Sequence, residues 1–202
     1  GLAIVIAFSV ATLVFMPMIV QATFHGKSYF DYIWPVVLGG GIIALTGLID
    51  DVKELKPLAK MSGIVLAASL IWLLTDFRLN HFKIPFGGSL LHFAPWLSFI
   101  LTVIWIISIT NAVNLIDGLD GLVSGVSIIS LVTMGIVSYF FLPEHNVFLT
   151  LTIFVLVMSI AGFFPYNYHP AIIYLGDTGA LFIGFMIAVL SLQGLKNATA
   201  VA

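Results

Sequence analysis

The chain has 202 residues, of which 61% are apolar and 8% charged, and its mean hydropathy is +1.18. Soluble domains carry roughly 25% charged residues, so this composition excludes an ordinary soluble fold and predicts a membrane protein. The net charge of −2 and the lack of a long basic run argue against a nucleic-acid partner, and the absence of cysteine excludes disulfides and thiolate metal sites.

Apolar stretches predict about seven membrane-spanning helices, since a span needs roughly 20 mostly apolar residues. In chain order the predicted spans cover residues 2–20, 33–49, 61–74, 95–111, 122–142, 147–164 and 180–194. No internal repeat of fixed period is evident, so we expect one all-α, polytopic helical bundle. Between the third and fourth spans, residues 82–84 and 90–92 flank a Gly-Gly pair and predict one short extracytoplasmic β-hairpin.

Counting the crossings assigns most acidic residues to one face of the membrane. The loops 50–60, 112–121 and 165–179 share that face, and they hold six of the nine acids: Asp50, Asp51, Glu54, Asp117, Asp120 and Asp177. The opposite face holds the other three acids and four of the five histidines, in which no metal-ligand spacing is evident: His25, His81, His92 and His145. Lysine and arginine divide too evenly between the faces for the positive-inside rule to orient the chain.

The second predicted span ends at two adjacent carboxylates, Asp50 and Asp51. Neighbouring negative charges at a lipid boundary are costly unless a cation or a proton neutralises them, which favours a bound divalent metal. The alternative is a hydrated cap on the next helix. Lys53, Lys56 and Lys60 then follow with the spacing of one helix face, either as a surface stripe or, for Lys60, as a phosphate contact.

Residues 111–121 form the most informative stretch, because four hydrogen-bonding side chains stand among apolar ones. Asn111, Asn114 and Asp117 step by three and would share one helix face, with Asp120 in the following turn. Polar groups gathered at a membrane boundary need partners. This stretch therefore predicts a binding site rather than a hydrated turn.

A third polar stretch, 167–179, ends one predicted span and begins the next. Asp177 lies between Gly176 and Gly179 at a helix start. A carboxylate there is either a metal ligand beside an anion-binding helix end or a simple N-cap. His169, which stands alone, is more typical of a structural or interfacial histidine.

Three ordered motifs resemble those of the polyprenyl-phosphate N-acetylhexosamine-1-phosphate transferases, and the resemblance covers essentially the whole chain. The motifs are GLIDDVKELKPLAK at 47–60, NAVNLIDGLDGL at 111–122 and GDTGALF at 176–182. Ile116, the hairpin at 79–93 and residues 191–194 are similar to the bacterial branch that starts teichoic-acid or O-antigen chains. Phospho-N-acetylmuramoyl-pentapeptide transferase, the lipid I synthase, is similar in the same motifs and is the alternative within the family.

The resemblance implies a magnesium-dependent reaction of a UDP-sugar with a polyprenyl phosphate. UDP-N-acetylglucosamine and undecaprenyl phosphate would give undecaprenyl-pyrophosphoryl-N-acetylglucosamine and UMP, directly or through an aspartyl intermediate. It implies a bacterial plasma membrane protein with a cytoplasmic active face, and it leaves a homodimer open. It also implies that residues 1–202 are one transmembrane catalytic domain, an internal fragment without the family's first span and its C-terminal histidine-rich loop with the final spans.

Roles follow from the resemblance position by position. Asp50 and Asp51 match the catalytic aspartate pair, and Asp177 together with Asp51 matches the magnesium ligands. The positions that match substrate contacts are Lys60, Asn111, Asn114, Asp117, Asp120, Asn167 and Tyr174. Two positions depart from the family pattern without removing a charge: Ile64 stands where many relatives have Gln, and Ala180 where Ser is usual.

Two other classes of membrane protein are weaker alternatives. A transporter would favour charges near the midplane of the membrane and an internal repeat, whereas the acids here stand at span ends. A CDP-alcohol phosphotransferase would place Ala-Arg shortly after an Asp-Gly pair. The segment 117–122 contains no arginine.

Overall fold

The computed structural model describes residues 1–18, 29–83, 90–141 and 147–199. Its helices are α1 (Leu2–Val10), η1 (Ala11–Phe15, a π-helical turn), α3 (Tyr29–Lys53), α4 (Pro57–Leu74), α5 (Pro95–Leu115), α6 (Leu122–Phe140), α7 (Val147–Asn167) and α8 (Gly176–Thr199). Within these described ranges six helices, α3 to α8, are long and apolar enough to cross a membrane. The first predicted span is a shorter apolar helix, Leu2–Met18. The predicted polytopic α-helical bundle is confirmed.

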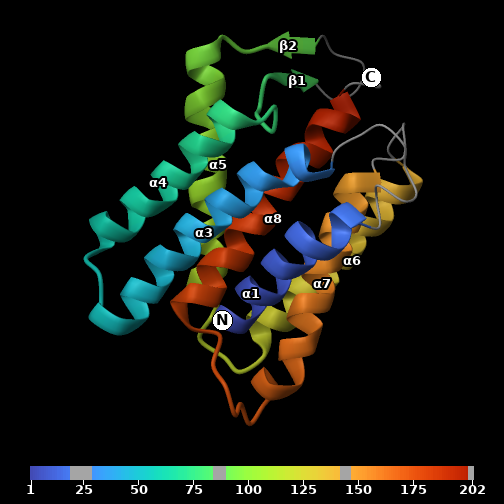
Figure 1. Cartoon of the computed structure of the whole chain (residues 1–202). Coiled ribbons are helices and arrows are strands. Elements are labelled where there is room, and N and C mark those ends of the chain that lie inside the picture. Colours follow the sequence, from blue (N-terminus) through green and yellow to red (C-terminus); the bar gives the residue numbers. More distant parts are fainter. Residues whose placement is uncertain (19–28, 84–89, 142–146, 200–202) are drawn as a thin grey trace.

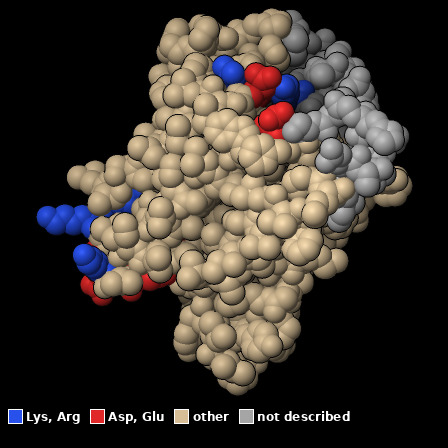
Figure 2. Space-filling view, in the orientation of Figure 1, with Lys and Arg blue, Asp and Glu red and all other residues tan. Residues whose placement is uncertain are grey.

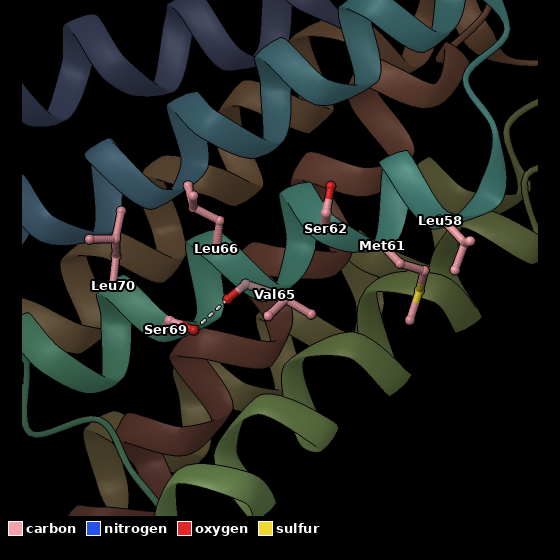
Figure 3. A pocket seen from close by; sticks show the side chains of 7 residues that line it. All are labelled: Leu58, Met61, Ser62, Val65, Leu66, Ser69 and Leu70. Carbon is pink, nitrogen blue, oxygen red and sulfur yellow. Dashed lines mark hydrogen bonds between the residues drawn. The ribbon is translucent and has the colours of Figure 1, made fainter.

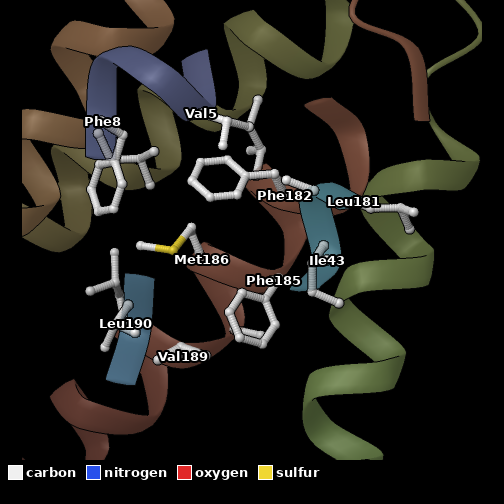
Figure 4. Packing of buried hydrophobic residues seen from close by; sticks show 14 of the residues in the cluster. Val5, Phe8, Ile43, Leu181, Phe182, Phe185, Met186, Val189 and Leu190 are labelled. Carbon is white, nitrogen blue, oxygen red and sulfur yellow. The ribbon is translucent and has the colours of Figure 1, made fainter. Parts of the chain in front are cut away.

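Helix α8 lies at the centre of the bundle (Figure 1) and packs most extensively against α3 and α5. In its apolar window 78% of the residues are buried, compared with 22% in α4. Figure 4 shows Phe182, Phe185 and Met186 of α8 packed with Ile43 of α3 and Phe8 of α1. A helix surrounded in this way is apolar on all sides, so its polar residues at the start stand out.

Glycines on α3 let this helix approach α8 closely. A Cβ atom added to Gly40 would lie 2.8 Å from the ring of Phe182, and one added to Gly47 would lie 2.6 Å from the Cα atom of Thr178. The contact at Gly47 is with backbone, which cannot rotate away. The end of α3 therefore lies directly against the start of α8, and the residues that follow Gly47 reach that start.

The connection from α3 to α4 overturns the predicted lysine stripe. Helix α3 ends at Lys53, Glu54 has a positive φ of 46°, and Lys56 is extended with ψ 145°. The cause is Pro57, because proline disfavours the helical conformation of the residue before it and is well tolerated at a helix start. Lys53, Lys56 and Lys60 consequently lie on different segments rather than on one helix face.

The loops that follow α3, α5 and α7 lie together at one end of the bundle, and the β-hairpin lies at the other (Figure 1). Charged side chains likewise form two groups separated by uncharged surface on the face drawn in Figure 2. The predicted common end of the three acid-bearing loops, opposite the hairpin, is therefore confirmed. The predicted loop residues 21–28 and 143–146, with His25, Glu144 and His145, lie outside the described residues.

The end of the bundle that carries the hairpin has its own ion pairs. Asp76 pairs with Arg78 and Lys196, each at 3.3 Å, and the Arg78 guanidinium lies 4.9 Å from the ring centroid of Trp72. Beyond them, β1 (His81–Lys83) and β2 (Leu90–His92) pair antiparallel. The predicted hairpin is confirmed, one residue earlier in its first strand.

Candidate active site

The carboxylate of Asp51 caps the first turn of α8. Its Oδ1 accepts a hydrogen bond from the backbone N–H of Asp177 at 2.7 Å, and its Oδ2 accepts from the N–H and the hydroxyl of Thr178 at 3.1 and 2.5 Å. Gly176 has a φ of +67°, and a Cβ there would lie 3.1 Å from both oxygens. Free N–H groups and a partial positive charge at a helix start favour such an anion. A cap is thus present, but on a helix more than a hundred residues away, not on the next one.

Lys60 forms ion pairs with two other carboxylates at this end of the bundle, those of Asp50 and Asp177. Its ammonium forms an ion pair with Asp50 and a second one, at 3.1 Å, with Asp177. Asp50 is only 7% exposed, and its Oδ1 also accepts a hydrogen bond from the backbone N–H of Leu55 at 2.6 Å. A carboxylate this deeply buried needs both the counter-ion and the hydrogen bond. One ammonium group therefore pairs with two acids from separate motifs, and its single positive charge offsets only one of the two negative charges.

Asn114, which belongs to the second of the three motifs, contacts the same group of side chains. Its side-chain N–H donates to Asp177 Oδ1 at 2.5 Å. Asp177 is thus held by Asn114 of α5 and Lys60 of α4, while Asp51 of α3 accepts hydrogen bonds from the first turn of α8. The structure therefore brings together Asp50, Asp51, Lys60, Asn114 and Asp177, and we call these five residues the acid cluster.

Asn111 and Asn114 both lie on α5, three residues apart and so on the predicted common face, whereas Asp117 lies beyond the end of the helix. The Asn111 amide donates to the Ile107 carbonyl at 3.0 Å and to the Met61 sulfur at 3.3 Å, outside the acid cluster. Helix α5 ends at Leu115, so Asp117 lies in the turn that follows. Burial, and then the negative charges of Asp177 and Asp51, raise the pKa of Asp117 to about 6.

Asp120 ties two loops at the same end of the bundle. Its Oδ2 accepts a hydrogen bond from the Ala171 N–H at 3.1 Å and lies 3.0 Å from His169 Nδ1. These two partners, the Ala171 N–H first, lower the pKa of Asp120. His169 thus has the structural contact predicted for it, because it links the α7–α8 loop to the α5–α6 turn.

Asn167 and Tyr174 lie apart from the acid cluster. Asn167 is 4% exposed, accepts a hydrogen bond from the Ser124 hydroxyl at 2.8 Å and donates to the Ile173 carbonyl at 3.1 Å. Its polar groups are therefore used to hold the α7–α8 loop on α6. Tyr174 is 71% exposed and presents its ring to the surroundings.

The acid cluster has the chemistry of a magnesium site. Asp50 and Asp177 already share one cation, the Lys60 ammonium, and carboxylates are the ligands that Mg²⁺ prefers. Among the described residues no group of three or more Asp, Glu, His or Cys side chains converges as a full ligand set. Magnesium commonly uses one or two carboxylates and completes its shell with phosphate oxygens and water. Two carboxylates therefore fit this metal.

Sequence reasoning missed two residues that build the site, Thr178 and Gly47. Thr178 supplies two of the three hydrogen bonds to Asp51, and Gly47 admits the close backbone contact described above. Both belong to the quoted motifs. The partners of both residues lie on another helix, which the sequence does not identify. The available sequence signals were the position of Thr178 at a predicted helix start and the presence of glycine at position 47 inside an apolar span.

An open groove of about 640 Å³ runs along the outer face of α4 (Figure 3). It is lined by Leu58, Met61, Ser62, Val65, Leu66, Ser69 and Leu70. The Ser69 hydroxyl donates to the Val65 carbonyl at 2.7 Å, and the Ser62 hydroxyl donates to the Ala59 carbonyl at 2.7 Å. Both hydroxyls are satisfied within the helix, so the groove offers mainly hydrocarbon.

Curated proteins with similar sequences carry related names. A "Probable undecaprenyl-phosphate N-acetylglucosaminyl 1-phosphate transferase" of Bacillus subtilis is 39% identical over 79% of this chain and 43% of its own length. A "Decaprenyl-phosphate N-acetylglucosaminephosphotransferase" of Mycolicibacterium smegmatis is 34% identical over 95% of this chain and 48% of its own. A "Phospho-N-acetylmuramoyl-pentapeptide-transferase" of Staphylococcus epidermidis is 34% identical over 90% and 60%. The chain spans about half the length of these relatives.

The family profile described as "Glycosyl transferase family 4" matches residues 33–195, which include all three motifs and every residue of the acid cluster. This match covers most of the chain and agrees with the resemblance stated from the motifs. The chain therefore belongs to glycosyl transferase family 4, a family of membrane enzymes that transfer phospho-sugars.

Proposed function

We propose that the protein transfers N-acetylglucosamine 1-phosphate from UDP-N-acetylglucosamine to undecaprenyl phosphate and releases UMP. The observation that carries the proposal is the ion-paired arrangement of Lys60 between Asp50 and Asp177, with Asn114 on the same carboxylate. Three motifs that are far apart in the sequence contribute to it. The name of the Bacillus subtilis relative, at 39% identity, supports this sugar and this lipid.

Phosphoryl transfer depends on neutralising charge and on aligning the reactants. In the proposed reaction an oxygen of the lipid phosphate attacks the phosphorus that bears the sugar, a new P–O–P bond forms, and the P–O bond to UMP breaks. Magnesium held by Asp50 and Asp177 would neutralise the pyrophosphate of the UDP-sugar. Lys60 adds a positive charge next to both carboxylates, within reach of a phosphate oxygen. Both oxygens of Asp51 are engaged by α8, so we assign it to positioning Asp177 rather than to the metal.

Three of the remaining predicted contacts, Asp117, Asp120 and Tyr174, belong to the nucleotide side of the site in this proposal. Asp117 lies in the turn beside the acid cluster, and Asp120 fixes the neighbouring loop through Ala171. The exposed ring of Tyr174 is free to stack on a base. We assign Asn111 and Asn167 to holding these segments, since their amides bond within the protein.

The α4 groove is the proposed path of the polyprenyl chain. Leu58 and Met61, which line the groove, lie at the start of α4, the same part of the helix that bears Lys60 on its inner face. A lipid whose phosphate reaches Lys60 would therefore pass around the start of α4 and extend its hydrocarbon along the groove. The apolar lining suits an isoprenoid. Because nucleotide sugars are cytoplasmic, the proposal also requires that the acid cluster faces the cytoplasm of a bacterial plasma membrane.

The Staphylococcus epidermidis relative supports a second candidate, transfer of phospho-N-acetylmuramoyl-pentapeptide. Both reactions use the same phosphate chemistry and differ in the sugar. The deciding experiment supplies purified full-length protein with undecaprenyl phosphate, Mg²⁺ and radiolabelled UDP-N-acetylglucosamine or UDP-N-acetylmuramoyl-pentapeptide, and measures label in extracted lipid together with released UMP. We expect transfer from the first donor, and its loss in Asp50→Asn. Transfer from the second donor alone would refute the first candidate and support phospho-N-acetylmuramoyl-pentapeptide transfer. Transfer from neither donor would refute both candidates.

A further inference from the structure

Two histidines face each other on the β-hairpin. The hairpin lies at the opposite end of the bundle from the loops that follow α3, α5 and α7 (Figure 1). The strand register pairs His81 of β1 directly with His92 of β2. Their imidazole rings are 4.7 Å apart between centroids and nearly perpendicular, at 78°. Both residues are exposed, so solutes reach the rings.

The hydrogen-bond pattern of the hairpin places the His81 and His92 side chains close together. The Phe93 N–H donates to the Asn80 carbonyl at 2.9 Å, which means that the bonded residues flank His81 and His92 rather than include them. Such non-hydrogen-bonded positions in antiparallel sheets hold their Cβ atoms closer than the alternating hydrogen-bonded ones. The two side chains therefore start from the same face of the hairpin at short range.

Paired imidazoles of this kind are metal ligands. A metal bound to one nitrogen of each ring at about 2.0–2.1 Å in tetrahedral geometry places those nitrogens roughly 3.3 Å apart. Rings whose centroids are 4.7 Å apart reach that separation by small side-chain rotations. Imidazole suits Zn²⁺, Ni²⁺ and Cu²⁺, with Cu²⁺ bound most strongly. Magnesium prefers oxygen, so the acid cluster and the histidine pair differ in the metals they select.

We propose that His81 and His92 form a binding site for one divalent first-row transition-metal ion on the hairpin. Two imidazole nitrogens come from the protein and water completes the coordination, since no third His, Asp, Glu or Cys ligand joins them in the part of the chain that the structure describes. The metal would cross-link β1 to β2. Because β1 also contacts α8, this cross-link would hold the hairpin on the end of the bundle that bears Asp76 and Lys196.

The test uses the whole protein in detergent, purified without a polyhistidine tag and kept in excess Mg²⁺ so that carboxylates do not compete. Cu²⁺ is added at one equivalent, and electron paramagnetic resonance counts the coordinated nitrogens. Zn²⁺ affinity is measured by competition with a chromophoric chelator. The variants are His81→Ala, His92→Ala and the double change Leu91→His with His92→Leu. The double change keeps the composition and moves one imidazole to the other face of the strand.

We expect two coordinated nitrogens in the parent and one in each variant, with Zn²⁺ affinity about tenfold or more lower in all three, since a second tethered ligand multiplies affinity. His169→Ala, at the other end of the bundle, should match the parent. Thermal unfolding without metal checks that the variants are folded. Parent affinity in the double variant, or a single nitrogen in the parent, would overturn the proposal.

Discussion

At the residue scale, Asp51 and Asp177 lie side by side but have different partners. Asp51 contacts the N–H groups of α8, whereas Asp177 contacts Lys60 and Asn114. A carboxylate engaged by a helix start contributes to stability, and one engaged by a single shared cation is available to a metal. The two acids should therefore respond differently to the same substitution.

Asp177→Asn should lower transfer by a factor on the order of 10² to 10³, the loss seen when one charge-stabilising group is removed from an active site. Because the proposed magnesium ligand is gone, the Mg²⁺ concentration for half-maximal activity should rise. Asp51→Asn keeps one accepting oxygen for α8, so it should shift that concentration much less. It should lower the free energy of unfolding by about 1 kcal/mol, since an amide NH₂ would replace the other oxygen. Magnesium titrations and thermal unfolding of both variants measure these effects. An equal magnesium shift in Asp51→Asn would return Asp51 to the metal site.

The raised pKa of Asp117 makes stability depend on pH. Its folded pKa is about 6 against an ordinary value of 3.8, so the folded state resists ionisation of this carboxyl. The resulting loss of stability is absent below the ordinary value, grows as pH rises toward 6 and is complete above it. Asp117→Asn removes the loss, so its melting temperature should exceed the parent's by more at about pH 8 than at about pH 5. A difference that is the same at both pH values would contradict this pKa.

At the element scale, the crossing of α3 and α8 holds the acid cluster together. Gly47→Ala would place a methyl group 2.6 Å from the Thr178 backbone, so the helices must separate and Asp51 must withdraw from α8. We expect a loss of about 1–3 kcal/mol in the free energy of unfolding, as for other overpacked sites, and a large fall in transfer. Unfolding and activity measurements on the same preparation test both effects.

Gly41 provides the matched control on the same helix. A Cβ at this position has no neighbour within 4 Å. Gly41→Ala should therefore keep activity and gain up to about 1 kcal/mol from the higher helix propensity of alanine. If both alanine variants behaved alike, the close approach at Gly47 would not be what supports the site.

At the scale of the whole molecule, sidedness can be measured directly because the chain contains no cysteine. Single cysteines at the exposed positions Glu54, Leu119 and Ile172 should either all react or all fail to react with a membrane-impermeant maleimide in intact cells. Leu91→Cys, on the hairpin, should give the opposite result. Labelling of the hairpin cysteine alone in intact cells would support a cytoplasmic acid cluster. Labelling of positions 54 and 119 from different sides would contradict the common end of their loops.

Much of the fold could be predicted because a bilayer imposes simple rules on a sequence. Each span must be long, apolar and helical, so the six long helices were recognisable and alternate crossings grouped the loops. The helix ends were less accurate: α3 begins four residues before the predicted span and ends four residues after it. Hydropathy marks the hydrocarbon core, whereas helices continue into the interface until a residue such as Pro57 interrupts them.

Hydrogen-bond partners could not be predicted, because they depend on how helices cross. The sequence indicated that Asp50, Asp51 and Asp177 need neutralising partners, but the choice of Lys60 for two of them and the start of α8 for the third depends on the approach of α3 at Gly47. The spacing of three between Asn111, Asn114 and Asp117 suggested one helix face. The first two share it on α5, but the helix ends at Leu115, before Asp117.

The sequence by itself determined the class of protein, the helices, the family motifs and the end of the bundle at which the acids gather, because these follow from local composition and from the alternation of crossings. Only the tertiary structure decided which carboxylate caps a helix, which ones share a lysine, and that His81 faces His92. Those relations join residues that are distant along the chain. Their distances are set by side-chain packing and strand register, which span composition does not specify.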